Sequence, residues 1–200
     1  YTTLFRSHEL ALSGLTPVAA GGLTVAGRDG VASRQIWSPA DIYRNAREKA
    51  RPDLREVVDR TVQALAGERV WIAEVSGGLD SAIVAGALTD QQRARVAQWV
   101  NHYVGDPEGD ERAFARPVVE RHGYDLTEVR RSGLTLSPAR LARSTDAFRP
   151  ATNDIDTDYN DDIAGRVESS GAWGSLTGQG GDVVFFQMPT FLIAFDEVLE

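Results

Sequence analysis

A glycine-rich loop between an apolar strand and an apolar helix constrains the fold of this chain more than any other feature. Residues 70–75 are rich in β-branched and aromatic side chains, which predicts a buried strand. The loop Ser76-Gly77-Gly78-Leu79-Asp80-Ser81 follows directly, and small apolar residues then predict a helix over 80–88. Because a strand that turns straight into a helix is half of a β-α-β unit, the loop predicts a parallel sheet.

The alternation continues along the chain after a helix predicted over 52–66. Further strands are expected over 96–104, 126–129 and 173–177, and further helices over 110–122, 137–145 and 158–170. Repeated β-α-β units predict an α/β fold with a doubly wound parallel sheet. Ligands bind at the carboxyl ends of the strands in such sheets, and the glycine-rich turns at 76–78 and 178–181 both follow strands.

The first 45 residues are rich in Gly, Thr, Ser and Pro. They predict short strands and turns at 15–18 and 21–25, a turn at 27–30 and a helix that Ser38 caps. We expect residues 1–45 to be the tail of an N-terminal domain with a linker, and residues 46–200 to form the α/β domain. Because the chain starts without methionine and stops just after an apolar segment, we expect a longer protein, with the second domain incomplete at its C-terminus.

Composition excludes several functions. The net charge of −8 argues against a general nucleic-acid binder, which needs a basic face. The absence of cysteine excludes disulfides, zinc-thiolate sites and a cysteine nucleophile in these residues, and it is compatible with a cytoplasmic protein. No apolar run reaches the roughly 18 residues of a membrane span, and we expect no signal peptide.

The residue types of the first loop are those of a phosphate site. Its two glycines let the backbone approach an anion, while the loop amides and the start of the following helix attract it. Ser76 and Ser81 add hydroxyl donors. Asp80 would repel a phosphate, so we expect it to hold a magnesium ion. The loop lacks the Gly-Lys-Ser/Thr of a Walker loop. The alternative is a structural turn with Asp80 as a helix cap.

The second turn, Thr177-Gly178-Gln179-Gly180-Gly181-Asp182, repeats this design. A strand ends, glycines follow, and a carboxylate stands before an apolar segment. Asp80 and Asp182 could therefore meet on one magnesium ion across the strand ends.

The two turns together resemble the synthetase domain of the asparagine synthetase superfamily, over residues 15–200. That superfamily includes asparagine synthetase, β-lactam synthetase and the lasso-peptide macrolactam cyclases. The resemblance implies an ATP-pyrophosphatase (adenine nucleotide alpha hydrolase-like) fold, with ATP and Mg²⁺ as cofactors. Residues 16–39 look like the link from an amidotransferase-like domain, and residues 110–116 look like the family's charged helix.

Site roles follow from the resemblance residue by residue. The residues expected to bind ATP are Ser76, Gly77, Gly78, Asp80, Ser81, Asn101 and Gly178. Asp80 and Asp182 match the magnesium ligands, and Asn101 and Gly178 would lie close to the adenosine. The family's catalytic lysine lies beyond the second turn, whereas Lys49 is the only lysine here. We therefore expect the catalytic lysine after Glu200 and residues 1–200 alone to be inactive.

Three details favour a lasso-peptide macrolactam cyclase within the superfamily. Gln179 replaces the glutamate of asparagine and β-lactam synthetases, Glu74 stands where an apolar residue is usual, and the run at 183–189 resembles actinobacterial cyclases. Such an enzyme adenylates an Asp or Glu side chain of a precursor peptide, whose N-terminal amine then closes the ring. A leader-binding protein and a leader peptidase are possible further partners. The alternatives are a glutamine-hydrolysing asparagine synthetase, a β-lactam synthetase-like enzyme, and a non-catalytic nucleotide-binding relic.

Other polar and aromatic features have structural interpretations. We expect the acidic stretch 154–162 to be a solvated helix start, with peptide binding as the alternative. His8, His102 and His122 lack metal spacing, although His102 ends a strand near the expected adenosine site. We expect Trp71 and Trp99 in the core, and residues 185–189 in the core or in a peptide channel.

Overall fold

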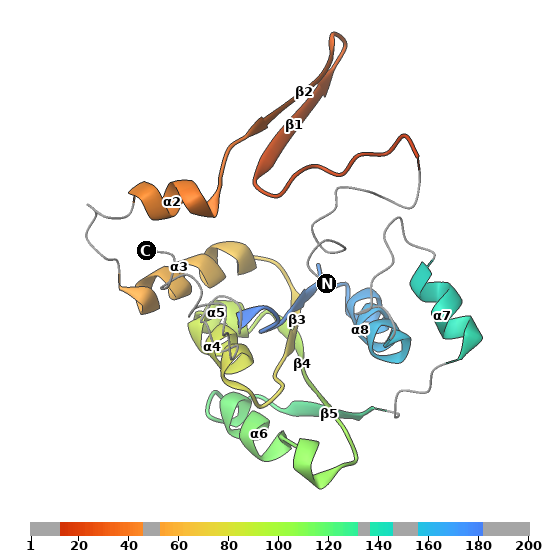
Figure 1. The fold of residues 1–200 in the computed structure, drawn as a ribbon. Coiled ribbons are helices and arrows are strands. Elements are labelled where there is room, and N and C mark those ends of the chain that lie inside the picture. Colours follow the sequence, from red (N-terminus) through yellow and green to blue (C-terminus); the bar gives the residue numbers. More distant parts are fainter. Residues whose placement is uncertain (1–12, 46–52, 132–136, 146–155, 182–200) are drawn as a thin grey trace, which may run out of the picture. The chain divides into compact units, whose positions relative to one another are not determined.

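The computed structural model describes residues 13–45, 53–131, 137–145 and 156–181. The chain divides into two compact units, one of residues 1–52 with 136–155 and one of residues 53–135 with 156–200. Figure 1 shows the elements of both units. In the described residues, no helix is both long and apolar enough to span a membrane.

The described residues of the first unit form a hairpin and two helices. Strands β1 (Gly22–Gly27) and β2 (Gly30–Gln35) pair in antiparallel fashion around the predicted turn. Helix α2 (Pro39–Asn45) begins as predicted, because the Ser38 hydroxyl accepts a hydrogen bond from the Asp41 amide. Helix α7 (Pro138–Thr145) begins in the same way at Ser137. The strand predicted at 15–18 is wrong, since these residues are coil; Pro17 removes a ladder donor there.

The second unit is built on a four-stranded parallel sheet. Its strands are β3 (Trp71–Glu74), β4 (Val96–Tyr103), β5 (Leu126–Arg130) and β6 (Ser175–Leu176). Their order is β5-β4-β3-β6, and each neighbouring pair is parallel. The chain therefore moves outward from β3 to β5 and returns on the other side of β3, which places the topological switch point between β3 and β6. The doubly wound parallel sheet is confirmed.

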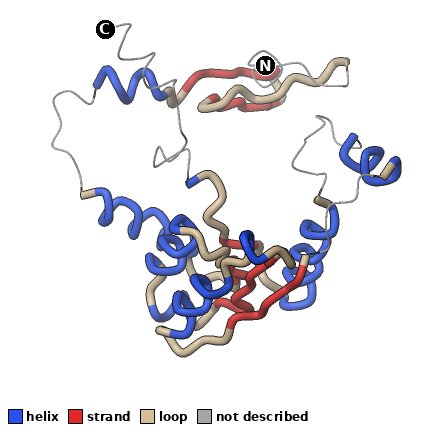
Figure 2. The backbone as a smooth tube through the Cα atoms, turned by 60° about the horizontal axis from the view of Figure 1, so that its bottom comes forward, coloured by secondary structure: helices blue, strands red, loops and turns tan. Residues whose placement is uncertain are grey.

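Helices cover both faces of this sheet, shown in red in Figure 2. Helices α3 (Leu54–Ala66), α4 (Leu79–Ala87) and α6 (Arg112–Glu120) lie on one face, and α8 (Thr157–Ser170) lies on the other (Figure 1). Two short elements were not predicted, α5 (Asp90–Arg93) and the 3-10 turn η2 (Pro107–Gly109). A capping box between Thr89 and Gln92 starts α5, which is too short to show a helical period.

The core lies between the sheet and the face covered by α3, α4 and α6. It contains Ala66, Ala73, Val75, Ala85, Leu88, Trp99, Ala115 and Val119. Trp71 and Trp99 are both buried, as predicted. The alternation along β3 sends Ala73 and Val75 into this core, and it sends Glu74 towards α8. A carboxylate therefore faces the opposite side of the sheet at the end of a central strand.

Candidate active site

The two glycine-rich turns meet at the switch point of the sheet. Strands β3 and β6 are in register with Ala73 opposite Leu176, so both strands end at the same edge. A Cβ atom on Gly178 would overlap the Ser81 amide, and one on Gly181 would overlap the Asp80 carboxyl group. The second turn therefore lies directly against the start of α4, at a distance that requires glycine.

Hydrogen bonds within the first loop define its shape. The Ser81 hydroxyl accepts from the Ser76 amide at 3.1 Å and lies 3.0 Å from the Ser76 hydroxyl. Gly77 has a φ of +107°, and a Cβ there would lie 2.6 Å from the Cβ of Glu111. The serines thus organise the loop itself, and their predicted role as direct phosphate donors stays a prediction.

Asp80 lies in the first turn of α4 and lines the cavity beside the loop. The N-cap of α4 is Gly78, and the helix has no side-chain cap, so the alternative role of Asp80 as a cap is wrong. Its buried Oδ1 has no hydrogen-bond partner among the described residues. A carboxylate oxygen held beside anion-binding amides without a donor fits a site for a divalent cation. Asp182, its predicted partner, lies outside the described residues.

Asn101 holds the start of the first loop through hydrogen bonds to its backbone. Its side chain is buried, and its amide nitrogen donates to the carbonyl oxygens of Val75 at 2.7 Å and Ser76 at 3.1 Å. These bonds join the end of β4 to the start of the loop. Asn101 is absent from the described lining of the cavity, so its geometry is that of a positioning residue for the loop.

A cavity of about 500 Å³ opens above the two turns, within the usual range of small-molecule sites. Its lining combines both turns with one side chain from β3 and one from α8: Glu74, Ser76, Gly78, Leu79, Asp80, Ser81, Tyr159, Thr177, Gly178, Gln179 and Gly180. The turns predicted from the sequence are thus brought together, and Gln179 is exposed at the cavity.

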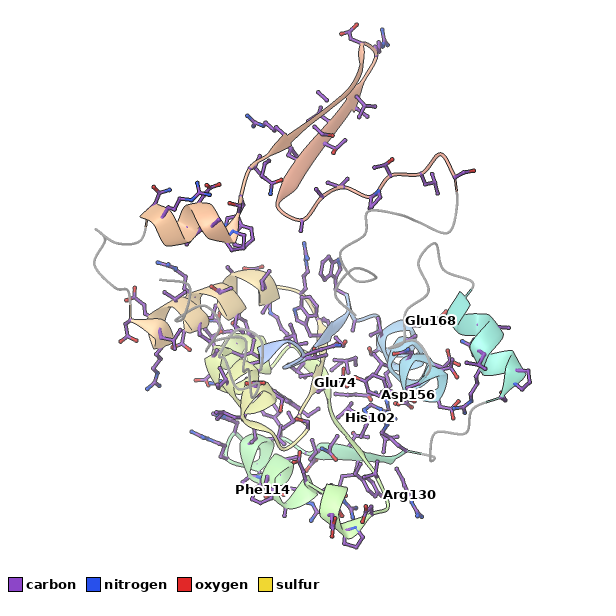
Figure 3. The ribbon with its side chains drawn as sticks, viewed as in Figure 1. Glu74, His102, Phe114, Arg130, Asp156 and Glu168 are labelled. Atoms are coloured by element: carbon purple, nitrogen blue, oxygen red, sulfur yellow. The ribbon has the colours of Figure 1, made fainter. Side chains whose placement is uncertain are left out.

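Glu74 and Tyr159, which line this cavity, belong to a polar network between the sheet and α8. Figure 3 shows Glu74, His102 and Asp156 in this region. The Tyr159 hydroxyl donates to Glu74 Oε2 at 2.5 Å. His102 Nε2 lies 2.9 Å from Asp162 Oδ2, and His102 Nδ1 lies 3.7 Å from Glu74 Oε2. Arg166 also binds the Asp162 carboxylate, at 2.6 Å.

The environment shifts the pKa of two groups in this network. The hydrogen bond from Arg166 and, less strongly, that from His102 lower the pKa of Asp162. Burial and the hydrogen bond to Glu74 raise the pKa of Tyr159 above its usual range. Sequence reasoning did not identify Tyr159 or Arg166, although Tyr159, Asp162 and Arg166 share one helix face by their spacing.

The acidic stretch is only partly solvated as predicted. Asp156 caps α8 by accepting from the Tyr159 amide and pairs with Arg131, whereas Asp162 faces the sheet. His102 is buried within the network, and His8 and residues 185–189 lie outside the described residues. Within the described part of the chain, no group of three or more His, Cys, Asp or Glu side chains could hold a metal ion.

The charged segment predicted as a family feature ties α6 to β5. Arg112 binds Asp110 and Glu128, and Arg116 binds the same Glu128 carboxylate. The Arg112 hydrogen bonds lower the pKa of Asp110 to about 2. These partners lie within the domain, which gives the segment a structural role.

The chain thus contains an α/β domain with a doubly wound sheet and two glycine turns at its switch point, the place where open α/β sheets bind their ligands. A sequence model of the asparagine synthase family matches residues 53–196. The chain therefore belongs to the asparagine synthase family, whose members are ATP-dependent ligases of the amide-forming type. No curated protein matches the chain significantly.

Proposed function

We propose that this domain catalyses adenylation of a carboxylate and that the protein is an AMP-forming amide ligase. The observation that carries the proposal is the meeting of the two glycine turns beside Asp80. There the loop amides and the start of α4 provide an anion site, next to a carboxylate oxygen without a partner.

Each part of the site then has a task. The loop from Ser76 to Ser81 binds the pyrophosphate part of ATP, and Asn101 holds the backbone of that loop in place. Asp80 holds a magnesium ion together with Asp182, and the ion neutralises phosphate charge when bound. An oxygen of the substrate carboxylate attacks the α-phosphorus, the bond to the β-phosphate oxygen breaks, and pyrophosphate leaves. The product is an acyl-adenylate.

We propose a peptide as the acyl substrate. An Asp or Glu side chain of a precursor peptide would be adenylated and then attacked by the N-terminal amine of the same peptide, which closes a macrolactam. Gln179 at the cavity and Glu74 at its side support this substrate, because both depart from the residues expected of asparagine synthesis. A leader-binding protein and a leader peptidase would be its partners. Holding amine and acyl-adenylate together would supply much of the rate.

A pyrophosphate-release assay on the full-length protein tests the proposal. We expect release that requires Mg²⁺ and a synthetic peptide with a free N-terminal amine and one Glu side chain. Aspartate-dependent release with AMP formation would instead identify an asparagine synthetase. Nucleotide binding without release for any acid would identify the non-catalytic relic and overturn the proposal.

A further inference from the structure

Glu74 is a nearly buried carboxylate at the side of the cavity that holds the phosphate loop. Its side chain is 13% exposed, and its buried Oε1 has no hydrogen-bond partner among the described residues. Among these described residues, no lysine or arginine side chain forms an ion pair with the Glu74 carboxylate. Within the described residues, Glu74 therefore has no lysine or arginine partner, although it lies only two residues before the loop.

Among the described residues, the groups that face Glu74 are Tyr159 and His102, and no lysine or arginine is among them. Tyr159 donates one neutral hydrogen bond to Oε2, and its hydroxyl is protonated at neutral pH because burial raises a pKa that is already near 10. His102 Nδ1 lies 3.7 Å from Oε2, beyond hydrogen-bond distance, while His102 Nε2 is engaged by Asp162. Arg131, near the Tyr159 ring, pairs with Asp156.

A buried carboxylate without a cation costs free energy, unless a ligand supplies the cation. The cavity already has an anion site at its loop, so a cationic group bound at Glu74 would lie beside the bound phosphates. An amide ligase needs such a group, because its second substrate is an amine that is protonated at neutral pH.

We infer that Glu74 binds the ammonium group of the amine substrate and accepts its proton, with Tyr159 positioning the carboxylate. This inference rests on the proposed ligase function. Glu74 would act when the amine attacks the acyl-adenylate, whereas the loop and Asp80 act when the acyl-adenylate is formed.

The ammonium nitrogen gives one proton to Glu74 and becomes a neutral amine. Its lone pair forms a bond to the acyl carbon of the acyl-adenylate, the bond from that carbon to the AMP oxygen breaks, and AMP leaves with the electron pair. The nitrogen then loses a second proton to solvent, which leaves the neutral amide.

Hydroxylamine separates the two halves of the reaction. It is uncharged at neutral pH, so it can capture an acyl-adenylate without giving a proton to Glu74. The full-length wild-type protein and its Glu74→Gln variant would receive ATP, Mg²⁺ and one of two peptides. The first peptide has a free N-terminal amine and one Glu side chain, and its macrolactam is measured by mass. The second is its N-acetylated form with hydroxylamine, and its hydroxamate is measured.

For Glu74→Gln, we expect macrolactam formation to fall about 100-fold or more, the usual range for a lost proton acceptor. Hydroxamate formation should stay within about twofold of wild type, since adenylation is intact. Continued hydroxamate formation would also show that the Glu74→Gln variant is folded. The matched control is Glu68→Gln, which makes the same change at a side chain that is 92% exposed. Both products should be unchanged in the control.

Two results for Glu74→Gln would overturn the assignment directly, and a third would pass the decision to a second variant. Glu74→Gln could form both products at the wild-type rate, which removes Glu74 from the reaction. It could require more Mg²⁺ for pyrophosphate release, which would make Glu74 a metal ligand. It could also lose both products, and then Tyr159→Phe decides. This variant keeps the carboxylate, so an equal loss of both products there would show a structural role, whereas a selective loss of macrolactam supports the inference. A wild-type protein without peptide-dependent pyrophosphate release would refute the ligase proposal itself.

Discussion

At the scale of single residues, the site depends on backbone approach more than on side-chain contacts. Gly178 and Gly181 allow the second turn to lie against Ser81 and Asp80, where any Cβ would overlap atoms of the first loop. The Asn101 amide then holds two carbonyl oxygens at the start of that loop. The three residues hold the two turns in place through their size and hydrogen bonds, although only Gly178 lines the cavity itself, and none of them needs to react.

Gly178→Ala should damage both stability and nucleotide binding. The added methyl group would overlap backbone atoms of Ser81 and Asp80, which cannot move as easily as a side chain end. We expect a loss of about 1–3 kcal/mol in the free energy of unfolding, the usual cost of overpacking. Denaturant unfolding and ATP titration measure the two effects.

Gly165→Ala is the matched control for this change. Gly165 lies within α8, and a Cβ there meets no atom within 4 Å. Since alanine is the better helix former, the free energy of unfolding of the control should rise by up to about 1 kcal/mol. An equal loss in both variants would show that Gly178 is not at a close contact.

At the scale of elements, α8 contributes a polar face where a packed helix usually presents an apolar one. Tyr159, Asp162 and Arg166 lie one turn apart and meet Glu74, His102 and Gln98 on the sheet. These contacts fix the position of α8 along β3 and β4. The same contacts set the side of the cavity, so the stability of α8 and the shape of the site are coupled.

Asp162→Asn should weaken the packing of α8 on the sheet in a pH-dependent way. Arg166 and His102 lower the pKa of Asp162 in the folded protein, so its stabilising effect is present above about pH 4, the value for an unfolded Asp. The effect is lost as the pH falls through the lowered pKa of the folded state. At pH 7 the variant should lose about 1–2 kcal/mol of unfolding free energy, and this difference should shrink below about pH 4.

Unfolding free energies measured from pH 7 to pH 3 test this expectation. Asp59→Asn is the control, because its ion pair with Arg55 is exposed and 3.9 Å long. It should change stability little at any pH. A difference between wild type and Asp162→Asn that stays constant with pH would contradict the pKa argument.

At the scale of the whole molecule, the four-stranded unit joins two distant parts of the sequence at one edge. Strand β6 lies beside β3, although about half of the chain separates them. The family match covers the same region, from residue 53 to residue 196. The predicted domain boundary after residue 45 stays a prediction. A ligand that binds at the switch point would contact both halves of this unit and stabilise it as a whole.

Magnesium-ATP should therefore raise the unfolding midpoint of the protein. At a ligand concentration of 100 times the dissociation constant, binding to the native state adds about 2.7 kcal/mol. Thermal unfolding with and without ATP and Mg²⁺ measures this gain, which should need both. The Asp80→Ala variant should lose the Mg²⁺-dependent part of this gain in the unfolding midpoint. The exposed control Asp125→Ala should keep it. An Asp80→Ala protein with the full Mg²⁺-dependent gain would remove Asp80 from the metal site.

Local signals in the sequence were sufficient for most of the architecture. The apolar strand at 70–75, the glycine loop and the small-residue helix after it are each recognisable within a few residues, so β3 and α4 were predicted closely. The second strand of the hairpin was missed, because its side chains are exposed and show no apolar alternation. The last strand is shorter than predicted, at two residues, because its apolar pattern extends beyond the paired stretch.

The sequence by itself therefore determined the α/β class, the phosphate-type loop and the family resemblance, because these depend on short-range periodicity and turn chemistry. Only the tertiary structure decided which residues share the cavity. Tyr159 and Glu74 are 85 positions apart, and their contact follows from how α8 lies across the sheet. The closeness of Gly178 to Ser81 likewise depends on the parallel register of β3 and β6. Such contacts depend on packing between elements, which no local pattern records.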